Sequence, residues 1–130
     1  MTPLSAYSTN MMRPRFWFER ISFSDSGNAL DCSCKVAADM PFFNGHFPNM
    51  PIMPAVAQIE MIQSLLQQHS PWETAINDGS KIKFSGPIVP GDVLAIRLQY
   101  KPGKKIGFEV RKESIVVTSG SFGVVRGIDD

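Results

Sequence analysis

The stretch from residue 42 to residue 60 reads Phe-Phe-Asn-Gly-His-Phe-Pro-Asn-Met-Pro-Ile-Met-Pro-Ala-Val-Ala-Gln-Ile-Glu. Its three prolines hold the backbone extended, because each fixes its own φ and pushes the preceding residue away from the helical region. Pro54 also suits the start of a helix, since the N–H that it lacks would be unpaired there. The stretch therefore predicts a proline-rich loop over residues 39–54 and a helix over residues 55–68, which ends before Pro71.

The bulk composition is that of one globular domain. The chain has 130 residues, of which 43% are hydrophobic, as expected of a folded domain of this length. No apolar run approaches the roughly 20 residues of a membrane-spanning helix, and the first twelve residues lack the regions of a signal peptide. We expect a flexible leader over residues 1–14, a single domain over residues 15–130, no membrane association and, for a bacterial source, a cytoplasmic location.

Charge is distributed unevenly along the chain. The net charge is +1, but residues 80–130 hold nine Lys/Arg against five Asp/Glu. A basic patch there would attract an acidic protein or a phosphate, although scattered lysines on strands are more often a solvated face. Without a denser basic stripe we expect no nucleic-acid binding. The candidate residues for an acidic partner are Lys81, Lys83, Lys101, Lys104, Lys105, Arg111 and Lys112.

The two cysteines are expected to be core residues. Cys32 and Cys34 alternate with polar residues in a predicted strand over residues 29–37, so both thiols should point to the buried face. A metal pair is the alternative, but no further cysteine or nearby histidine supplies the remaining ligands. We therefore predict buried thiols and no metal site.

The periodicity of the remaining chain predicts one helix among antiparallel strands. The strands are expected over residues 16–23, 29–37, 81–84, 93–101, 105–113 and 114–125, with a loop over residues 71–79. Such an order indicates an α+β protein whose sheet wraps around the helix. Val56 is placed on the apolar face of the helix, Phe84 and Val116 are expected to point inward, and Gly120 is expected where the helix lies close to the sheet.

Two blocks of residues resemble a known family. Phe43–Pro48, followed by Pro51, Pro54 and Glu60, looks like the active-site signature of the β-hydroxyacyl-(acyl-carrier-protein) dehydratases. The runs Ile-Lys-Phe from residue 82 and Pro-Ile-Val-Pro-Gly-Asp from residue 87 resemble the second block of that family. The resemblance covers roughly residues 16–125 and is nearest to the branch that serves aryl-polyene or polyketide-type pathways. It implies a hotdog fold, in which a curled antiparallel sheet of about five to six strands surrounds one long helix, paired as a homodimer or a larger assembly.

The resemblance also implies a reaction and a set of site residues. The family removes water from a 3-hydroxyacyl thioester, carried by acyl carrier protein or coenzyme A, to give a trans-2-enoyl thioester, without a cofactor or a metal. His46 matches the base that takes the α-proton, and Glu60 matches the carboxyl group that serves the departing hydroxyl from the opposite subunit. The N–H of Ala55 faces the thioester carbonyl. The positions that match substrate-binding residues are Phe43, Gly45, Phe47, Met50, Met53 and Pro54.

Other interpretations remain open for these residues. His46 is alternatively a surface or core histidine, Glu60 the first residue of a polar stripe on the helix, and Met53 plain core. The chain also departs from the family pattern, which usually has glycine in place of Ala55 and an aliphatic residue in place of Gln58.

Two further functions are therefore kept beside the dehydratase. One is a hotdog acyl-thioesterase, and the other is a non-catalytic subunit that binds acyl groups or carrier protein. Ser64 stands where the fatty-acid enzymes tend to carry glutamine. Glutamate rather than aspartate at position 60 indicates dehydration without isomerisation of the double bond.

Overall fold

The computed structural model describes residues 16–37, 52–72 and 76–124. They form six strands and one helix, with the predicted leader over residues 1–14 lying outside the described residues. The elements are β1 (Phe18–Phe23), β2 (Ala29–Lys35), α2 (Ala55–His69), β3 (Ile76–Phe84), β4 (Val93–Lys101), β5 (Lys105–Lys112) and β6 (Ile115–Val124).

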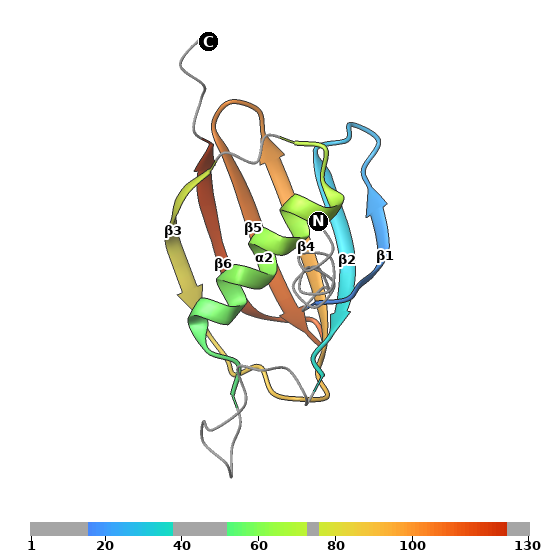
Figure 1. Cartoon of the computed structure of the whole chain (residues 1–130), viewed down its shortest axis with the longest axis vertical. Coiled ribbons are helices and arrows are strands. Elements are labelled where there is room, and N and C mark those ends of the chain that lie inside the picture. The colour runs from blue at the N-terminus through green and yellow to red at the C-terminus, as the bar shows by residue number, and fades with distance from the viewer. Residues whose placement is uncertain (1–15, 38–51, 73–75, 125–130) are drawn as a thin grey trace, which may run out of the picture.

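All six strands belong to one antiparallel sheet in the order β1-β2-β4-β5-β6-β3. Figure 1 shows the sheet curving behind α2, which crosses it diagonally, with β1 and β3 at the two edges. Because β2 lies near one edge and β3 at the other, the chain between them carries the helix across the concave face. The predicted α+β arrangement is confirmed.

The helix buries two rows of side chains that are spaced four residues apart. Its 15 residues run from Ala55 to His69, close to the predicted range. The buried positions are Ala57, Gln58, Met61, Ile62, Leu65 and Leu66. Val56 was expected among them but is 73% exposed, because its side chain lies on the outer side of the helix, away from the buried rows that begin at Ala57 and Gln58. Among the described residues, no helix is long and apolar enough to cross a membrane.

The concave face of the sheet supplies the other half of the core. Alternate residues of β2, β4 and β5 are buried, as their sequence patterns predict, and they contact the helix rows in one cluster. Among the largest of these side chains are Leu30, Leu94, Ile96, Leu98, Ile106, Phe108 and Val110.

The sheet departs from the predictions along β3 and β6. β3 begins at Ile76, inside the expected loop. Its first residues are typical of a turn, but pairing with β6 stabilises them as a strand. Phe84 remains 44% exposed at the end of this edge strand, so the prediction that it points inward is wrong. A register shift opposite Val110 also makes Val117 rather than Val116 the buried residue, as a β-bulge does.

Both cysteines are buried on the concave face, as predicted. Burial raises the pKa of the Cys32 thiol to about 12 and that of the Cys34 thiol to about 11. For Cys32, the neighbouring Cys34 and Asp31 add to the increase. Both sulfurs therefore keep their protons at neutral pH and are poor nucleophiles.

Gly120 is required by its neighbours on the sheet rather than by the helix. A Cβ atom at this position would lie 2.8 Å from Cγ1 and 3.0 Å from Cα of Ile82, and 3.0 Å from Cζ of Phe108. The expectation that the helix makes the close approach is therefore wrong: the partners come from β3 and β5. At Gly107, by contrast, the nearest atoms to such a Cβ are backbone oxygens at 3.9 Å.

Gly120→Ala is expected to lower the free energy of unfolding by about 1–3 kcal/mol, the usual result of overpacking a core. Gly107→Ala is the matched control, because it adds the same methyl group to a strand without a close contact and should change stability by less than about 1 kcal/mol. Urea denaturation of both variants measures the difference. Equal stability of the two variants would contradict the close packing of Ile82.

The thiols should resist alkylation in the native protein. At pH 8, a thiol whose pKa is raised by two or more units has about 100-fold less thiolate than an unperturbed one. Labelling by iodoacetamide should therefore be slower by at least that factor than labelling in urea, and should accelerate as the pH rises toward 11. Native labelling as fast as in urea would show that the thiols are not buried.

Candidate active site

The structure describes only some of the predicted site residues. Met53, Pro54, Ala55 and Glu60 lie within the described residues. The others, Phe43, Gly45, His46, Phe47 and Met50, lie outside them. The predicted pairing of His46 with Glu60 therefore stays a prediction, and the geometry of the site is built from the start of the helix.

The start of α2 presents main-chain N–H groups at the surface. Pro54 is extended, with φ −70° and ψ 157°, and its carbonyl accepts hydrogen bonds from the N–H groups of Ala57 at 3.0 Å and Gln58 at 3.1 Å. The exposed Ala55 donates to no other residue of the described ranges. Its N–H lies at the positive end of the helix dipole, where it can bind a carbonyl oxygen that gains negative charge.

Glu60 lies on a flank of the helix that the sheet leaves partly uncovered. It is half-buried and follows the exposed Val56 by four residues, so the two side chains share one face. A rise of about 1.5 Å per residue places it roughly 7.5 Å further along the axis than Ala55. The carboxyl group of Glu60 and the main-chain N–H of Ala55 are thus separated along the helix axis by roughly the length of a short acyl segment.

Met53 is fixed on all sides just before the helix. Its N–H donates to the carbonyl of Ile88 at 2.8 Å, and its carbonyl accepts from the Nε2 of Gln58 at 3.1 Å. Its side chain is buried in the core. The core position agrees with the simpler of the two interpretations, while a role in lining an acyl tunnel stays a prediction.

The turn over residues 88–92 anchors the chain on both sides of the segment that contains His46. Val36 donates to the carbonyl of Asp92 at 2.8 Å and accepts from the N–H of Gly91 at 2.8 Å. The bond from Met53 to Ile88 holds the other side. Residues before and after the segment are therefore tied to a single turn. Sequence reasoning matched this block to the family but assigned it no role.

A half-buried ion pair holds this turn in shape. The Oδ2 atom of Asp92 accepts from the N–H of Val89 at 2.8 Å and from Nζ of Lys112 at 3.0 Å. Lys112 also donates to the carbonyl of Pro87 at 3.1 Å. Gly91 lies inside the turn with φ +94°, a conformation that favours glycine. The side chains of Asp92 and Lys112 are only 17% and 28% exposed, so water screens their attraction weakly.

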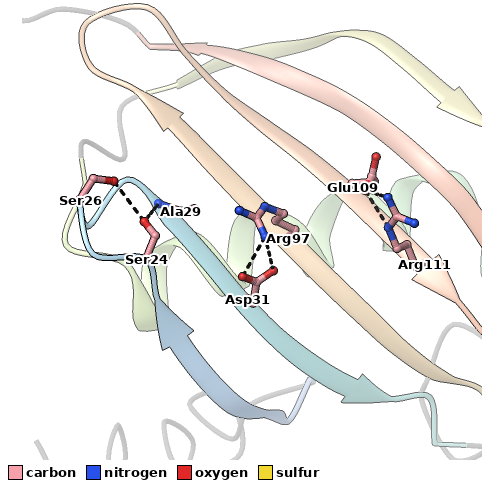
Figure 2. Close-up of polar contacts among 7 residues, drawn as sticks. All are labelled: Ser24, Ser26, Ala29, Asp31, Arg97, Glu109 and Arg111. Atoms are coloured by element: carbon pink, nitrogen blue, oxygen red, sulfur yellow. Dashed lines mark hydrogen bonds and ion pairs between the residues drawn. The ribbon is translucent and has the colours of Figure 1, made fainter. Parts of the chain in front are cut away.

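Two other ion pairs lie on the face of the sheet opposite the helix. Figure 2 shows Asp31 with Arg97, and Glu109 with Arg111, projecting from neighbouring strands into solvent. The side chains of Asp31 and Arg97 are 48% and 50% exposed, and the Oδ2 atom of Asp31 lies 3.2 Å from the Nη1 atom of Arg97. Pairs of this kind contribute little to stability. The pair of Asp92 and Lys112 differs from them because its side chains are mostly buried.

The described residues hold no metal-binding cluster. Within the described ranges, no three His, Cys, Asp or Glu side chains lie together in a way that would bind a metal ion. What the described part of the site offers is therefore main-chain donors at the helix start and the carboxyl group of Glu60.

Residues 22–121 match the ApeI-like family, described as ApeI dehydratase. The chain is 31% identical over 121 residues to the 3-hydroxyacyl-(acyl-carrier-protein) dehydratase FabZ of Clostridium kluyveri. The aligned segment covers 88% of this chain and 74% of that protein. It therefore belongs to the ApeI-like dehydratase family.

The chain also resembles a much longer relative and solved structures of similar fold. The bifunctional enzyme LpxC/FabZ of Porphyromonas gingivalis is 36% identical over 72 residues, or 49% of this chain, and the chain spans only 16% of that protein. A chain of the dehydratase heterocomplex ApeI:P from Xenorhabdus doucetiae superposes with a TM-score of 0.74 at 19% identity, covering 85% of this chain and 98% of that chain. The likeness confirms the predicted hotdog fold.

Asp92→Asn should destabilise the protein by about 1–3 kcal/mol, because it removes the charged partner of a half-buried ammonium group. Asp31→Asn makes the same chemical change in the exposed pair and should cost less than about 1 kcal/mol. Urea denaturation of both variants at low and high salt measures this difference. Equal losses in the two variants would show that the Asp92 pair does not hold the turn.

Proposed function

We propose that this chain is a 3-hydroxyacyl-thioester dehydratase that acts on acyl chains carried by acyl carrier protein. The observation that supports it most is the main-chain N–H of the exposed Ala55, at a helix start that hydrogen bonds hold from both sides, with the carboxyl group of Glu60 further along the same helix. Membership of the ApeI-like dehydratase family supports the same reaction.

The proposed elimination uses three groups of the chain. The imidazole of His46 takes a proton from C2 of the acyl chain, and the electron pair left behind forms the C2–C3 double bond. The C3–O bond breaks, and the hydroxyl group leaves as water with a proton from the Glu60 carboxyl group. The thioester oxygen gains negative charge on the way, which the N–H of Ala55 stabilises. The reaction is redox-neutral and both proton transfers have a side chain, so the proposal needs no cofactor.

We also propose that a second copy of the chain completes the site. Among the described strands, β3 lies at an edge of the sheet and pairs with β6 alone. The exposed Phe84 at its end lies opposite Thr118, whose hydroxyl group bonds to the first turn of the helix. Figure 1 shows the same proximity, since β3 ends near the start of α2. A partner on this edge would cover Val56 and Phe84 and set Glu60 of one copy against His46 of the other.

One of the solved structures that superpose on this chain comes from a dehydratase heterocomplex, so we propose a different hotdog chain as the alternative occupant of this edge. Native mass spectrometry of the purified chain separates the two. A stable dimer supports pairing of identical copies, and a monomer that lacks activity contradicts it.

The carrier protein is proposed to bind to exposed lysines. Arg111 and Lys112 already pair with carboxylates, which leaves Lys81 and Lys83 on β3 as the basic residues nearest to the proposed subunit edge. We also propose a cytoplasmic location, where acyl carrier protein would be available as the donor. We propose aryl-polyene or polyketide-type synthesis as the pathway, and dehydration without isomerisation as the outcome.

Wild-type protein should interconvert 3-hydroxybutyryl and crotonyl thioesters, followed at the ultraviolet band of the alkene. His46→Ala and Glu60→Gln should each lower kcat by about 100-fold or more, the usual contribution of a general acid or base. Mixing the two variants under conditions of subunit exchange should restore activity, because a mixed dimer regains one intact site.

Three outcomes would contradict the proposal. Release of free thiol without alkene would make the protein a thioesterase. Thioester binding without turnover, unchanged in His46→Ala, would make it a binding subunit. Finally, no recovery in the mixture despite subunit exchange would refute the sharing of sites between copies.

A further inference from the structure

Two buried polar side chains meet beneath the start of the helix. In the part of the chain that the structure describes, Gln58 and Thr118 are the polar side chains that are buried, with exposures of 5% and 1%. They come from α2 and β6, 60 residues apart, and are hydrogen bonded to each other. No hydrogen-bonding atom of a buried side chain is left without a partner in these residues.

The direction of each hydrogen bond is determined by its partners. The carbonyl of Met53 can only accept, so the Nε2 of Gln58 must face it, at 3.1 Å. The Oε1 atom is then left to accept from the hydroxyl group of Thr118, at 2.5 Å. The side-chain amide has one placement in which both bonds form, and the main chain before the helix must fit that placement.

Gln58 also holds the next peptide group. Its main-chain N–H donates to the carbonyl of Pro54 at 3.1 Å, beside the bond from Ala57. That carbonyl shares a planar trans peptide with the N–H of Ala55, and the two groups point in opposite directions. Fixing the carbonyl of Pro54 toward the helix therefore fixes the N–H of Ala55 away from it. Gln58 thus restrains both peptide groups that precede the helix.

An apolar residue would be the simpler choice at this position. Gln58 belongs to the buried row that continues with Ile62 and Leu66, and burying an amide costs free energy unless every bond is made. A buried network in which each polar atom has a partner instead selects one arrangement of the surrounding chain. Accurate positioning of the main chain at the helix start therefore explains why a glutamine is buried here.

We propose that Gln58, held by Thr118, is a positioning residue for the Ala55 amide that binds the thioester carbonyl. The inference rests on the proposed dehydratase function. A donor that acts on charge developing in the transition state must be placed to within a fraction of an ångström, and a misplacement of 1 Å costs about 100-fold in rate. Loss of the clamp should therefore lower kcat and leave KM nearly unchanged.

The test compares matched variants in the hydration of crotonyl thioester. Thr118→Val removes the hydroxyl group at constant shape, and Thr118→Ser keeps it. Thr118→Val and Gln58→Leu should each lower kcat by about 10-fold or more with KM within about twofold, while Thr118→Ser should retain most of kcat. The double variant should be no worse than the poorer single variant, because the two side chains act as one unit.

Gln58→Glu adds a readout that a merely structural role would not change. A protonated carboxyl group can accept from Thr118 and donate to the Met53 carbonyl as the amide does, whereas the carboxylate cannot donate. Burial raises the pKa of a carboxyl group at this position. The ratio of its kcat to that of wild type should therefore be highest at low pH and fall as the pH rises, while the ratio for Gln58→Leu stays flat.

Circular dichroism and thermal unfolding identify the folded variants, and kcat is given per folded molecule. If wild type is active and folded Thr118→Val and Gln58→Leu keep full kcat, or raise KM alone, the positioning role is refuted while the dehydratase function stands. If Gln58→Leu does not fold, the comparison of Thr118→Val with Thr118→Ser decides by the same criterion. Wild type that turns over no 3-hydroxyacyl or enoyl thioester refutes the proposed function, and the positioning role with it.

Discussion

The burial of one long helix against the concave face of the sheet is the constraint on which the rest of this structure depends. The apolar rows of α2 leave a single side to be covered, and the alternating strands curl around it. In the first turn, Ala57 and Gln58 are buried against the sheet, while Ala55 and Val56 on the outer side are exposed. This packing leaves the N-terminal residues of the helix at the surface, where a main-chain N–H can bind an oxygen that gains charge.

Main-chain hydrogen bonds convert this packing into an accurate position. The N–H of Met53 is held by the turn over residues 88–92, and its carbonyl is held by Gln58. The same turn holds Val36 on the other side of the segment that contains His46. Of these anchors only the bond from Gln58 comes from a side chain, and that side chain is buried. In the proposed mechanism the proton transfers are carried out by the side chains of His46 and Glu60.

The sequence predicted the elements whose signal is local. The helix over residues 55–68, the alternation in three central strands and the buried thiols followed from periodicity and proline placement, and the structure confirms them. The early start of β3 was missed because residues that resemble a turn are stabilised there by distant pairing with β6. The bulge that buries Val117 instead of Val116 depends on the same long-range register.

For the candidate site, the structure tests only the location of some residues. Ala55 and Glu60 were expected on one helix, and the structure places both there, while their roles stay predictions. The family resemblance marked Gln58 as a polar residue where relatives tend to be aliphatic, but its partner Thr118 is 60 residues away and no local pattern connects them. Likewise, the pairing of Asp92 with Lys112 needs the fold before it can be recognised.

The most direct measurement of the central claim is the infrared stretching frequency of a thioester carbonyl bound to the protein. A crotonyl thioester labelled with carbon-13 at the carbonyl, bound to His46→Ala so that turnover is slow, isolates this band. A hydrogen bond from the Ala55 amide in a site that excludes water predicts a lower frequency than in aqueous solution. A frequency equal to or higher than that in water would show that the helix start does not bind the carbonyl, and would contradict the account.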